Sequence, residues 1–319
     1  MISPMKKKIA SPRWRRPSHP ACCPPSFPSS QNQHFMKTLI ISSLATLVAV
    51  SALYAAEPIP DDHKINGFAI GCQAYTFNRF SAFEAIEKTA TAGGKVIEFY
   101  PGQKLSKEEP ELKVDHNATP ETIAKVKAKL AEHGMMAVAY GVVGLSKDEA
   151  ECRKVFEFAK TMGIRVINTE SVDAIDTFEP LVKEYDIKVG FHDHPKREQD
   201  PNYRMWDPNY ILSVVKDRDP RIGSCADTGH WMRSGLKPVD CLRILKGHVV
   251  SSHLKDLNGF VRLAHDMPYG QGEGDVDGIL KELKAQGFEG PISIEYEHKW
   301  EESLPDVTAC IDYVKAWKS

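Results

Sequence analysis

Residues 222–230 read IGSCADTGH, a short run of small and apolar residues that ends in Asp227, Thr228, Gly229 and His230. Such a run is typical of a strand buried on both faces of a parallel sheet. Three further runs also end in polar residues, namely His192-Asp193-His194, His253-Leu254-Lys255-Asp256 and Glu295. Because the strands of a parallel barrel bring their carboxyl ends to one mouth, we expect these side chains to converge.

Strand-like and helix-like segments alternate along the rest of the chain. The apolar runs predict eight strands, at 69–74, 95–100, 135–140, 165–169, 188–191, 222–226, 249–253 and 291–295. Apolar residues at helical spacing predict the intervening helices, at 82–92, 120–133, 147–162, 172–185, 208–216, 238–245, 276–286 and 305–317. Eight strand-helix units without a break in composition predict an α/β fold, a single (β/α)8 TIM barrel with parallel strands. A doubly wound open sheet is the alternative, but its glycine-rich phosphate turn is missing after the first strand, where the chain reads Tyr75-Thr76-Phe77-Asn78.

The N-terminal part of the chain reads as a targeting segment. Residues 36–56 begin with Met36-Lys37, continue in an apolar run over 39–53 and end in small residues before Glu57, which is the pattern of a secretory signal peptide. Residues 1–35, rich in proline, serine and basic residues, are expected to be a non-structural extension. We therefore expect an exported protein, periplasmic or extracellular, with its barrel over 57–319. The apolar run is shorter than the roughly 20 residues of a membrane span, so no stable span is expected after cleavage.

Composition narrows the class of partner. Beyond the signal the cysteines are odd in number and lack paired spacing, which argues against a disulfide framework. The net charge is -2 and no basic tract follows the signal, which argues against nucleic acid as a partner. A small sugar or glycoside fits better, although neither the identity of the sugar nor the oligomeric state is encoded in these patterns.

The order of the strand-end motifs resembles the sugar isomerase/epimerase family with the xylose-isomerase-like barrel, which includes a DNA-repair endonuclease branch. The resemblance rests on Asp227-Thr228-Gly229-His230, His253-Leu254-Lys255-Asp256 and Glu295. It implies that Asp227, His253 and Glu295 bind one divalent metal ion, and that His230 contacts the substrate or adds a ligand. A mixed nitrogen and oxygen shell suits Mn, Zn, Co, Fe or Mg.

The fifth predicted strand departs from the family. Its sugar epimerases usually end this strand with a Glu that binds the metal and acts as one of two bases, whereas this chain has His192. An imidazole still binds metal, so His192 is retained as a ligand and as a catalytic candidate. Glu170, after the fourth strand, is a candidate replacement carboxylate, with a helix N-terminal charge as its alternative role.

The family chemistry is proton abstraction beside a carbonyl, through an enediolate that the metal stabilises. By analogy Glu295 is a base. Lys255 is a second candidate, because a nearby cation disfavours its ammonium form, with an ion pair to Asp256 as the alternative. Substrate contacts are expected from residues near the same mouth, with simple packing as the alternative for the aromatic one: His194, His230, Glu170, Glu98, Trp231 and His265.

We therefore expect a divalent-metal-dependent sugar or keto-sugar isomerase or epimerase. A metal-dependent lyase or hydratase that performs β-elimination on 3-keto-glycosides is the main alternative, favoured by export and by the missing fifth-strand Glu. A non-catalytic carbohydrate-binding barrel is a further alternative. The endonuclease chemistry is disfavoured by export and by the lack of a basic tract.

Overall fold

Residues 58–318 of the protein are described from a computed structural model. The expected extension over 1–35 and the expected signal over 36–56 lie outside the described residues. Between residues 58 and 318, no helix combines the length and the apolar character that crossing a membrane requires.

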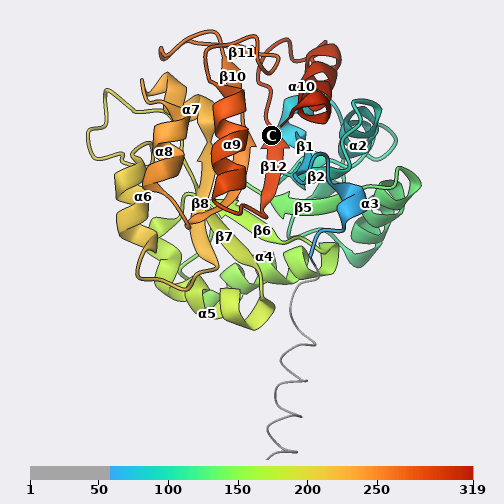
Figure 1. The fold of residues 1–319 in the computed structure, drawn as a ribbon. Coiled ribbons are helices and arrows are strands. Elements are labelled where there is room, and N and C mark those ends of the chain that lie inside the picture. The colour runs from blue at the N-terminus through green and yellow to red at the C-terminus, as the bar shows by residue number, and fades with distance from the viewer. Residues whose placement is uncertain (1–57, 319) are drawn as a thin grey trace, which may run out of the picture. The chain divides into compact units, whose positions relative to one another are not determined.

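Eight parallel strands close into a barrel, which confirms the predicted TIM barrel (Figure 1). The strands are β1 (Ala69–Gln73), β2 (Val96–Phe99), β5 (Met136–Tyr140), β6 (Val166–Thr169), β7 (Lys188–His192), β8 (Ile222–Asp227), β9 (Val249–Leu254) and β12 (Pro291–Ile294). They pair in the order β1-β12-β9-β8-β7-β6-β5-β2, and the ring closes through the pairing of β1 with β2. Each strand coincides with a predicted apolar run to within one or two residues.

The helices that follow the strands surround the barrel (Figure 1). Their N-termini carry the signals that start a helix: Ser81 and Glu84 form a reciprocal capping box, and Thr119 and Asp207 each cap a helix that begins with proline. The helices that the sequence predicted are α2 (Ala82–Thr91), α3 (Pro120–Glu132), α4 (Glu149–Met162), α5 (Ile175–Tyr185), α6 (Pro208–Val215), α8 (Pro238–Ile244), α9 (Val276–Ala285) and α10 (Leu304–Ala316).

Several short elements were not predicted. Helix α7 (Thr228–Arg233) begins directly at the end of β8. Two hairpins lie in the long connections after β2 and β9, and strands of two residues are too short to give a periodic pattern. These hairpins pair β3 (Gln103–Lys104) with β4 (Lys113–Val114) and β10 (Asp256–Leu257) with β11 (Asp266–Met267).

The barrel interior holds a buried polar network. Asn168 donates to Glu98 Oε1 at 2.8 Å, and the Ser251 hydroxyl donates to Asn168 Oδ1 at 2.7 Å. Ser293 donates to Glu98 Oε2 at 2.6 Å. Gly190 on β7 makes room for this network, because a Cβ there would lie 2.7 Å from Asn168 Oδ1. Buried polar groups that satisfy one another in this way fix the positions of the side chains they contact.

Candidate metal centre

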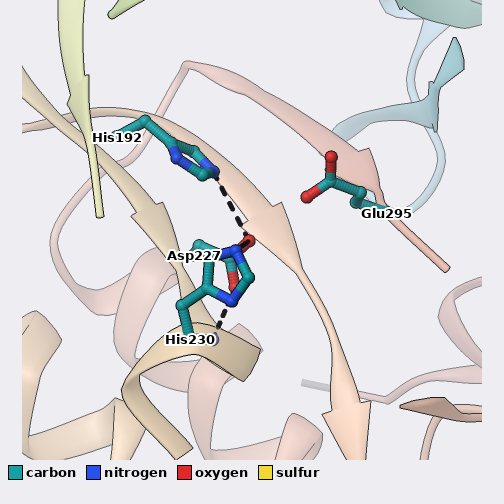
Figure 2. Close-up of side chains that lie close together, drawn as sticks. All are labelled: His192, Asp227, His230 and Glu295. Carbon is teal, nitrogen blue, oxygen red and sulfur yellow. Dashed lines mark hydrogen bonds and ion pairs between the residues drawn. The ribbon is translucent and has the colours of Figure 1, made fainter. Parts of the chain in front are cut away.

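The strand ends converge as the sequence predicted. Donor atoms of His192, Asp227, His230 and Glu295 lie within 4.8 Å of one another, and Figure 2 shows these side chains facing a common point. His253 on β9 lies at the edge of this group. Its Nδ1 is 3.1 Å from His192 Nε2 and 3.2 Å from Glu295 Oε2.

The two oxygens of Asp227 have different tasks. Oδ1 accepts the backbone N–H of His230 at 2.7 Å and so caps α7, while the Asp227 backbone N–H donates to Asp193 Oδ1 at 2.8 Å. Oδ2 is buried and makes no well-aligned hydrogen bond, but its charge is paired with the Lys255 ammonium at 3.1 Å, and it lies 3.5 Å from His192 Nε2. Because the ion pair uses only part of the accepting capacity of a carboxylate oxygen, Oδ2 could also bind a cation.

His253 lies between two carboxylates. Its Nε2 is 3.0 Å from Glu98 Oε2 and its Nδ1 is 3.2 Å from Glu295 Oε2. Burial lowers the pKa of His253, but Cys225, Glu98 and Glu295 outweigh burial and raise the pKa well above its ordinary value. A metal ion would displace the proton on Nδ1, while Glu98 would keep the Nε2 proton. A carboxylate on the far nitrogen is the usual way in which a ligating histidine is oriented.

His230 has a different hydrogen-bonding pattern. Arg233 donates Nη1–H to His230 Nδ1 at 3.3 Å, and Nε2 lies 3.6 Å from Asp227 Oδ2. Burial, the main cause, lowers the pKa of His230 well below its ordinary value, so the ring is neutral. Because a guanidinium can only donate, a neutral His230 carries its hydrogen on Nε2. This tautomer favours a hydrogen-bond donor over a metal ligand.

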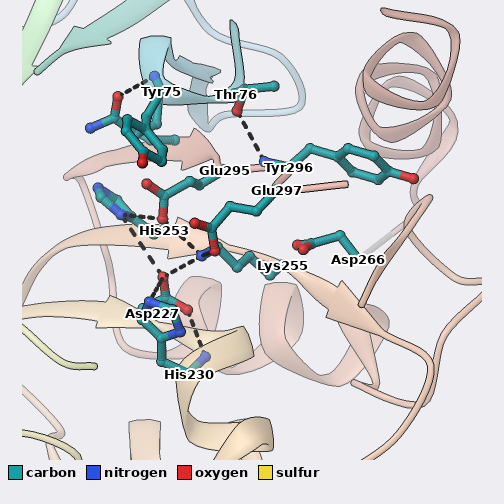
Figure 3. Close-up of polar contacts among 12 residues, drawn as sticks. Tyr75, Thr76, Asp227, His230, His253, Lys255, Asp266, Glu295, Tyr296 and Glu297 are labelled. Carbon is teal, nitrogen blue, oxygen red and sulfur yellow. Dashed lines mark hydrogen bonds and ion pairs between the residues drawn. The ribbon is translucent and has the colours of Figure 1, made fainter. Parts of the chain in front are cut away.

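Lys255 is fully buried beside the same carboxylates (Figure 3). Its Nζ lies 3.1 Å from Asp227 Oδ2 and 2.8 Å from the Oε2 atoms of both Glu295 and Glu297. Burial lowers the pKa of Lys255, but these carboxylates outweigh it and raise the pKa well above its ordinary value. The charges of the chain alone favour the ammonium form, whereas the predicted role of Lys255 in proton transfer depends on a bound cation and stays a prediction.

The ion pair that the sequence suggested between Lys255 and Asp256 is replaced by another arrangement. Asp256 accepts backbone N–H groups of Gly270, Gly272 and Gly274 at 2.9, 3.0 and 2.8 Å. A side chain on Gly272 would place its Cβ 2.3 Å from Asp256 Oδ1. Asp256 therefore anchors the glycine-containing loop after β9, and Lys255 is left to the carboxylates of the metal centre.

A cavity of about 320 Å³ opens over the cluster. At its rim Tyr75 makes edge contacts with Tyr100 and Trp300, at ring-centroid distances of 5.2 and 5.9 Å. The size and the mixture of aromatic and polar walls suit a small polar ligand. The cavity is lined by Gln73, Tyr75, Tyr100, Pro101, Gly141, Val142, His192, His194, His230, Glu295 and Glu297.

The other predicted substrate contacts lie in different places. His194 lines the cavity. Glu170 is not among the lining residues but is the hydrogen-bond partner of His194. Glu98 belongs to the network below the cluster. Trp231 is 1% exposed within the hydrophobic core and does not line the cavity, so packing describes its place. His265 stacks on the ring of His298, at a centroid distance of 4.4 Å, and also lies outside the cavity lining.

Two charged residues near the cluster were missed by the sequence analysis. Glu297 pairs with Lys255 and with Arg233 Nη1, the latter at 3.1 Å. Arg233 also donates to Asp266 at 3.1 Å and so joins α7 to the loop after β9. For Arg233 the sequence did contain a signal. It follows His230 by three residues, about one helical turn, so the two side chains could lie on the same face of a helix.

The residues present fit a divalent cation. His192, Asp227, His253 and Glu295 offer two imidazole nitrogens and two carboxylates, a donor set that suits Mn, Zn, Co, Fe or Mg. Oδ2 of Asp227, which makes no hydrogen bond, lies among these donors. The choice of these four as ligands, with His230 outside the shell, stays a prediction.

A family model identifies the class of protein. The family model of the xylose isomerase-like TIM barrel matches residues 86–314, and the chain belongs to this family. No curated protein sequence matches the chain significantly.

Solved structures share the fold. An uncharacterized protein from Parabacteroides distasonis ATCC 8503 is 28% identical, with a TM-score of 0.63, over 78% of this chain and 98% of that chain. An L-ribulose 3-epimerase is 15% identical, with a TM-score of 0.56, over 77% and 92% of the two chains. A xylose isomerase-like TIM barrel protein from Mycobacterium smegmatis in complex with magnesium is 14% identical, with a TM-score of 0.58, over 75% and 89%. At these last two identities the likeness concerns the fold alone.

Proposed function

We propose that the protein is a divalent-metal-dependent isomerase or epimerase of a sugar or keto-sugar. The observation that carries the proposal is the convergence of donor atoms from His192, Asp227 and Glu295, with His253 Nδ1 beside them, beneath a cavity at the carboxyl mouth. Membership of the xylose isomerase-like family supports the same class of chemistry. Export of the protein, as the N-terminal sequence predicts, belongs to this proposal.

A divalent cation bound there supplies Lewis acidity, which stabilises negative charge that develops on substrate oxygens. Glu295 borders the cavity and is the candidate proton acceptor. Burial raises the pKa of Glu295, but Lys255 and His253 outweigh burial and hold the pKa well below its ordinary value, so the carboxylate is ionised and able to take a proton. The Nε2–H of His230 is placed to donate to a sugar oxygen. Lys255 holds Asp227 and Glu295 in place by charge.

A lyase that eliminates the aglycone from a 3-keto-glycoside shares the first proton abstraction. The specific observation that favours the lyase is His192. An epimerase with two carboxylate bases would need its second carboxylate at this position. After the proton is removed beside the ketone, the electron pair expels the glycosidic oxygen, and a proton donor completes the leaving group. The two reactions share the metal centre and differ in whether a group leaves after the proton is removed.

Metal analysis of the purified mature protein tests the common core of both reactions. Asp227→Ala and His253→Ala are expected to abolish retention of one divalent ion per chain, whereas Asp240→Ala, an exposed aspartate on α8, should retain it. Incubation with Mn and free ketoses or 3-keto-glycosides in deuterated water then separates the reactions. Solvent deuterium in an isomerised sugar supports the isomerase, and release of aglycone supports the lyase. Metal retained by both site variants would overturn the ligand assignment.

A further inference from the structure

His194 and Glu170 form a hydrogen-bonded pair at the cavity wall. His194 follows β7 and lines the cavity, and its Nδ1 contacts Oε1 of Glu170, which follows β6. The hydroxyl of Tyr203 donates to the same oxygen at 3.2 Å. The ring of His194 also stacks on His230, with a centroid distance of 4.9 Å and an interplanar angle of 26°. The imidazole is thus held by its edge and by its face.

The hydrogen bond between His194 and Glu170 determines which ring nitrogen of His194 carries the hydrogen. An ionised carboxylate only accepts hydrogen bonds, so Glu170 selects the tautomer of His194 with hydrogen on Nδ1. The lone pair then lies on Nε2, for which no hydrogen bond to any residue within 58–318 is found. A carboxylate that orients a histidine and stabilises its imidazolium form is a recurrent arrangement for proton transfer.

The pair lies across the mouth from Glu295. In the closed ring, β7 is separated from β12 by β8 and β9, and β6 lies one strand further. His194 and Glu295 nevertheless line the same cavity. A substrate held between them would meet one proton-transfer group on each side.

We propose that His194 is a catalytic proton acceptor and donor of this site and that Glu170 is its positioning residue. The inference rests on the proposed function and deepens it, because the loop after β7 would supply the second group that His192 does not. In the epimerisation direction, His194 Nε2 takes the proton from the substrate carbon. The C–H electron pair becomes the double bond of the enediolate as the carbonyl electrons move to oxygen. A proton from solvent is delivered to the opposite face, on the side that Glu295 borders, and His194 then releases its proton to solvent.

The first test needs no substrate. In full mature protein labelled with 15N-histidine, the ring-nitrogen signals of His194 are assigned by their loss in His194→Gln. We expect the Nδ1–H tautomer in the wild type and a shift toward Nε2–H in Glu170→Ala, with Glu301→Ala as an exposed control. Wild-type His194 in the Nε2–H form would overturn the proposal.

The second test measures exchange of substrate hydrogen with deuterated water in the Mn-loaded protein. His194→Gln should lose about 100-fold or more of the exchange rate, in the range typical of a general base, while it keeps the metal and the melting temperature of the wild type. Added imidazole should restore part of the rate to His194→Gly. His248→Gln, a histidine outside the cavity lining, is the matched control. A rate within about threefold of wild type would overturn the catalytic role.

A bound cation is the competing explanation, because donor atoms of Glu170, His192 and His194 also lie within 4.8 Å of one another. Two metal ions per wild-type chain, with one lost in Glu170→Gln, would overturn the proposal in favour of that explanation. If the wild-type protein catalyses hydrogen exchange on none of the sugars tested, the proposed function fails. The tautomer measurement still decides whether Glu170 positions His194.

Discussion

The buried ammonium of Lys255 gives the sharpest test of how the centre is held together. Lys255→Met keeps much of the volume of the stem and removes the charge that contacts Asp227, Glu295 and Glu297 at 3.1, 2.8 and 2.8 Å. Asp227 then loses its nearest cation, while Glu295 keeps its contact with His253 and Glu297 keeps its contact with Arg233. Removal of one partner from a buried ionic cluster costs about 3–5 kcal/mol, because the remaining charges stay buried and uncompensated.

The sign with respect to pH is fixed by the direction of the pKa shift. The pKa of Lys255 is raised in the folded protein, so its contribution to stability is fully present below the unfolded pKa of about 10.4 and is lost only as pH rises through the higher folded value. A measurement at pH 7 therefore sees the whole effect. For a domain of this size about 1 kcal/mol corresponds to roughly 2–4 °C, so we expect the melting temperature to fall by about 6–20 °C.

Thermal unfolding with chelator and with excess Mn is the assay. A cation at 100 times its dissociation constant stabilises the folded state by about 2.7 kcal/mol. It should raise the melting temperature of Lys255→Met by more than that of the wild type, because no ammonium competes for the carboxylates. Lys281→Met, which breaks an exposed pair with Asp277, should cost at most about 1 kcal/mol. A Lys255→Met melting temperature within about 2 °C of wild type in chelator would refute the reasoning.

Two further outcomes follow from the same contacts. Because the pKa of His253 is raised, metal binding should release a proton and weaken as pH falls. Calorimetry in two buffers of different ionisation enthalpy measures this proton release. Equal apparent binding enthalpies in the two buffers would contradict it. Asp256→Ala should free the loop that contains 270–274, seen as faster amide hydrogen exchange there, whereas unchanged protection would show that the three hydrogen bonds to Asp256 do not hold the loop.

The barrel was predictable because its strands are buried on both faces and its helices start with local signals. Apolar runs bounded by polar residues mark each strand independently of the rest of the chain, and Thr119-Pro120 and Asp207-Pro208 mark helix starts. Helix α7 was not predictable in the same way. It has six residues, and its first turn is stabilised by Asp227, a residue that the sequence also marks as a metal ligand.

The residue types at the mouth were predictable, but their protonation was not. Hydrogen-bond partners decide it, and those partners are distant in sequence, as with Glu98 and His253 at 3.0 Å. Lys255 shows the difficulty most clearly. The sequence placed it beside Asp256, but Lys255 lies between β9 and β10 and reaches Asp227, while Asp256 holds the glycine loop.

The charges around the cluster favour a neutral substrate. Asp227, Glu295 and Glu297 provide three negative charges; Lys255 contacts all three, and Arg233 contacts Glu297. Neither lysine nor arginine is among the residues that line the cavity over the described chain, so a phosphate group would meet carboxylates without a cationic side chain. We therefore propose a neutral sugar or glycoside, and not a sugar phosphate, as the ligand of this cavity.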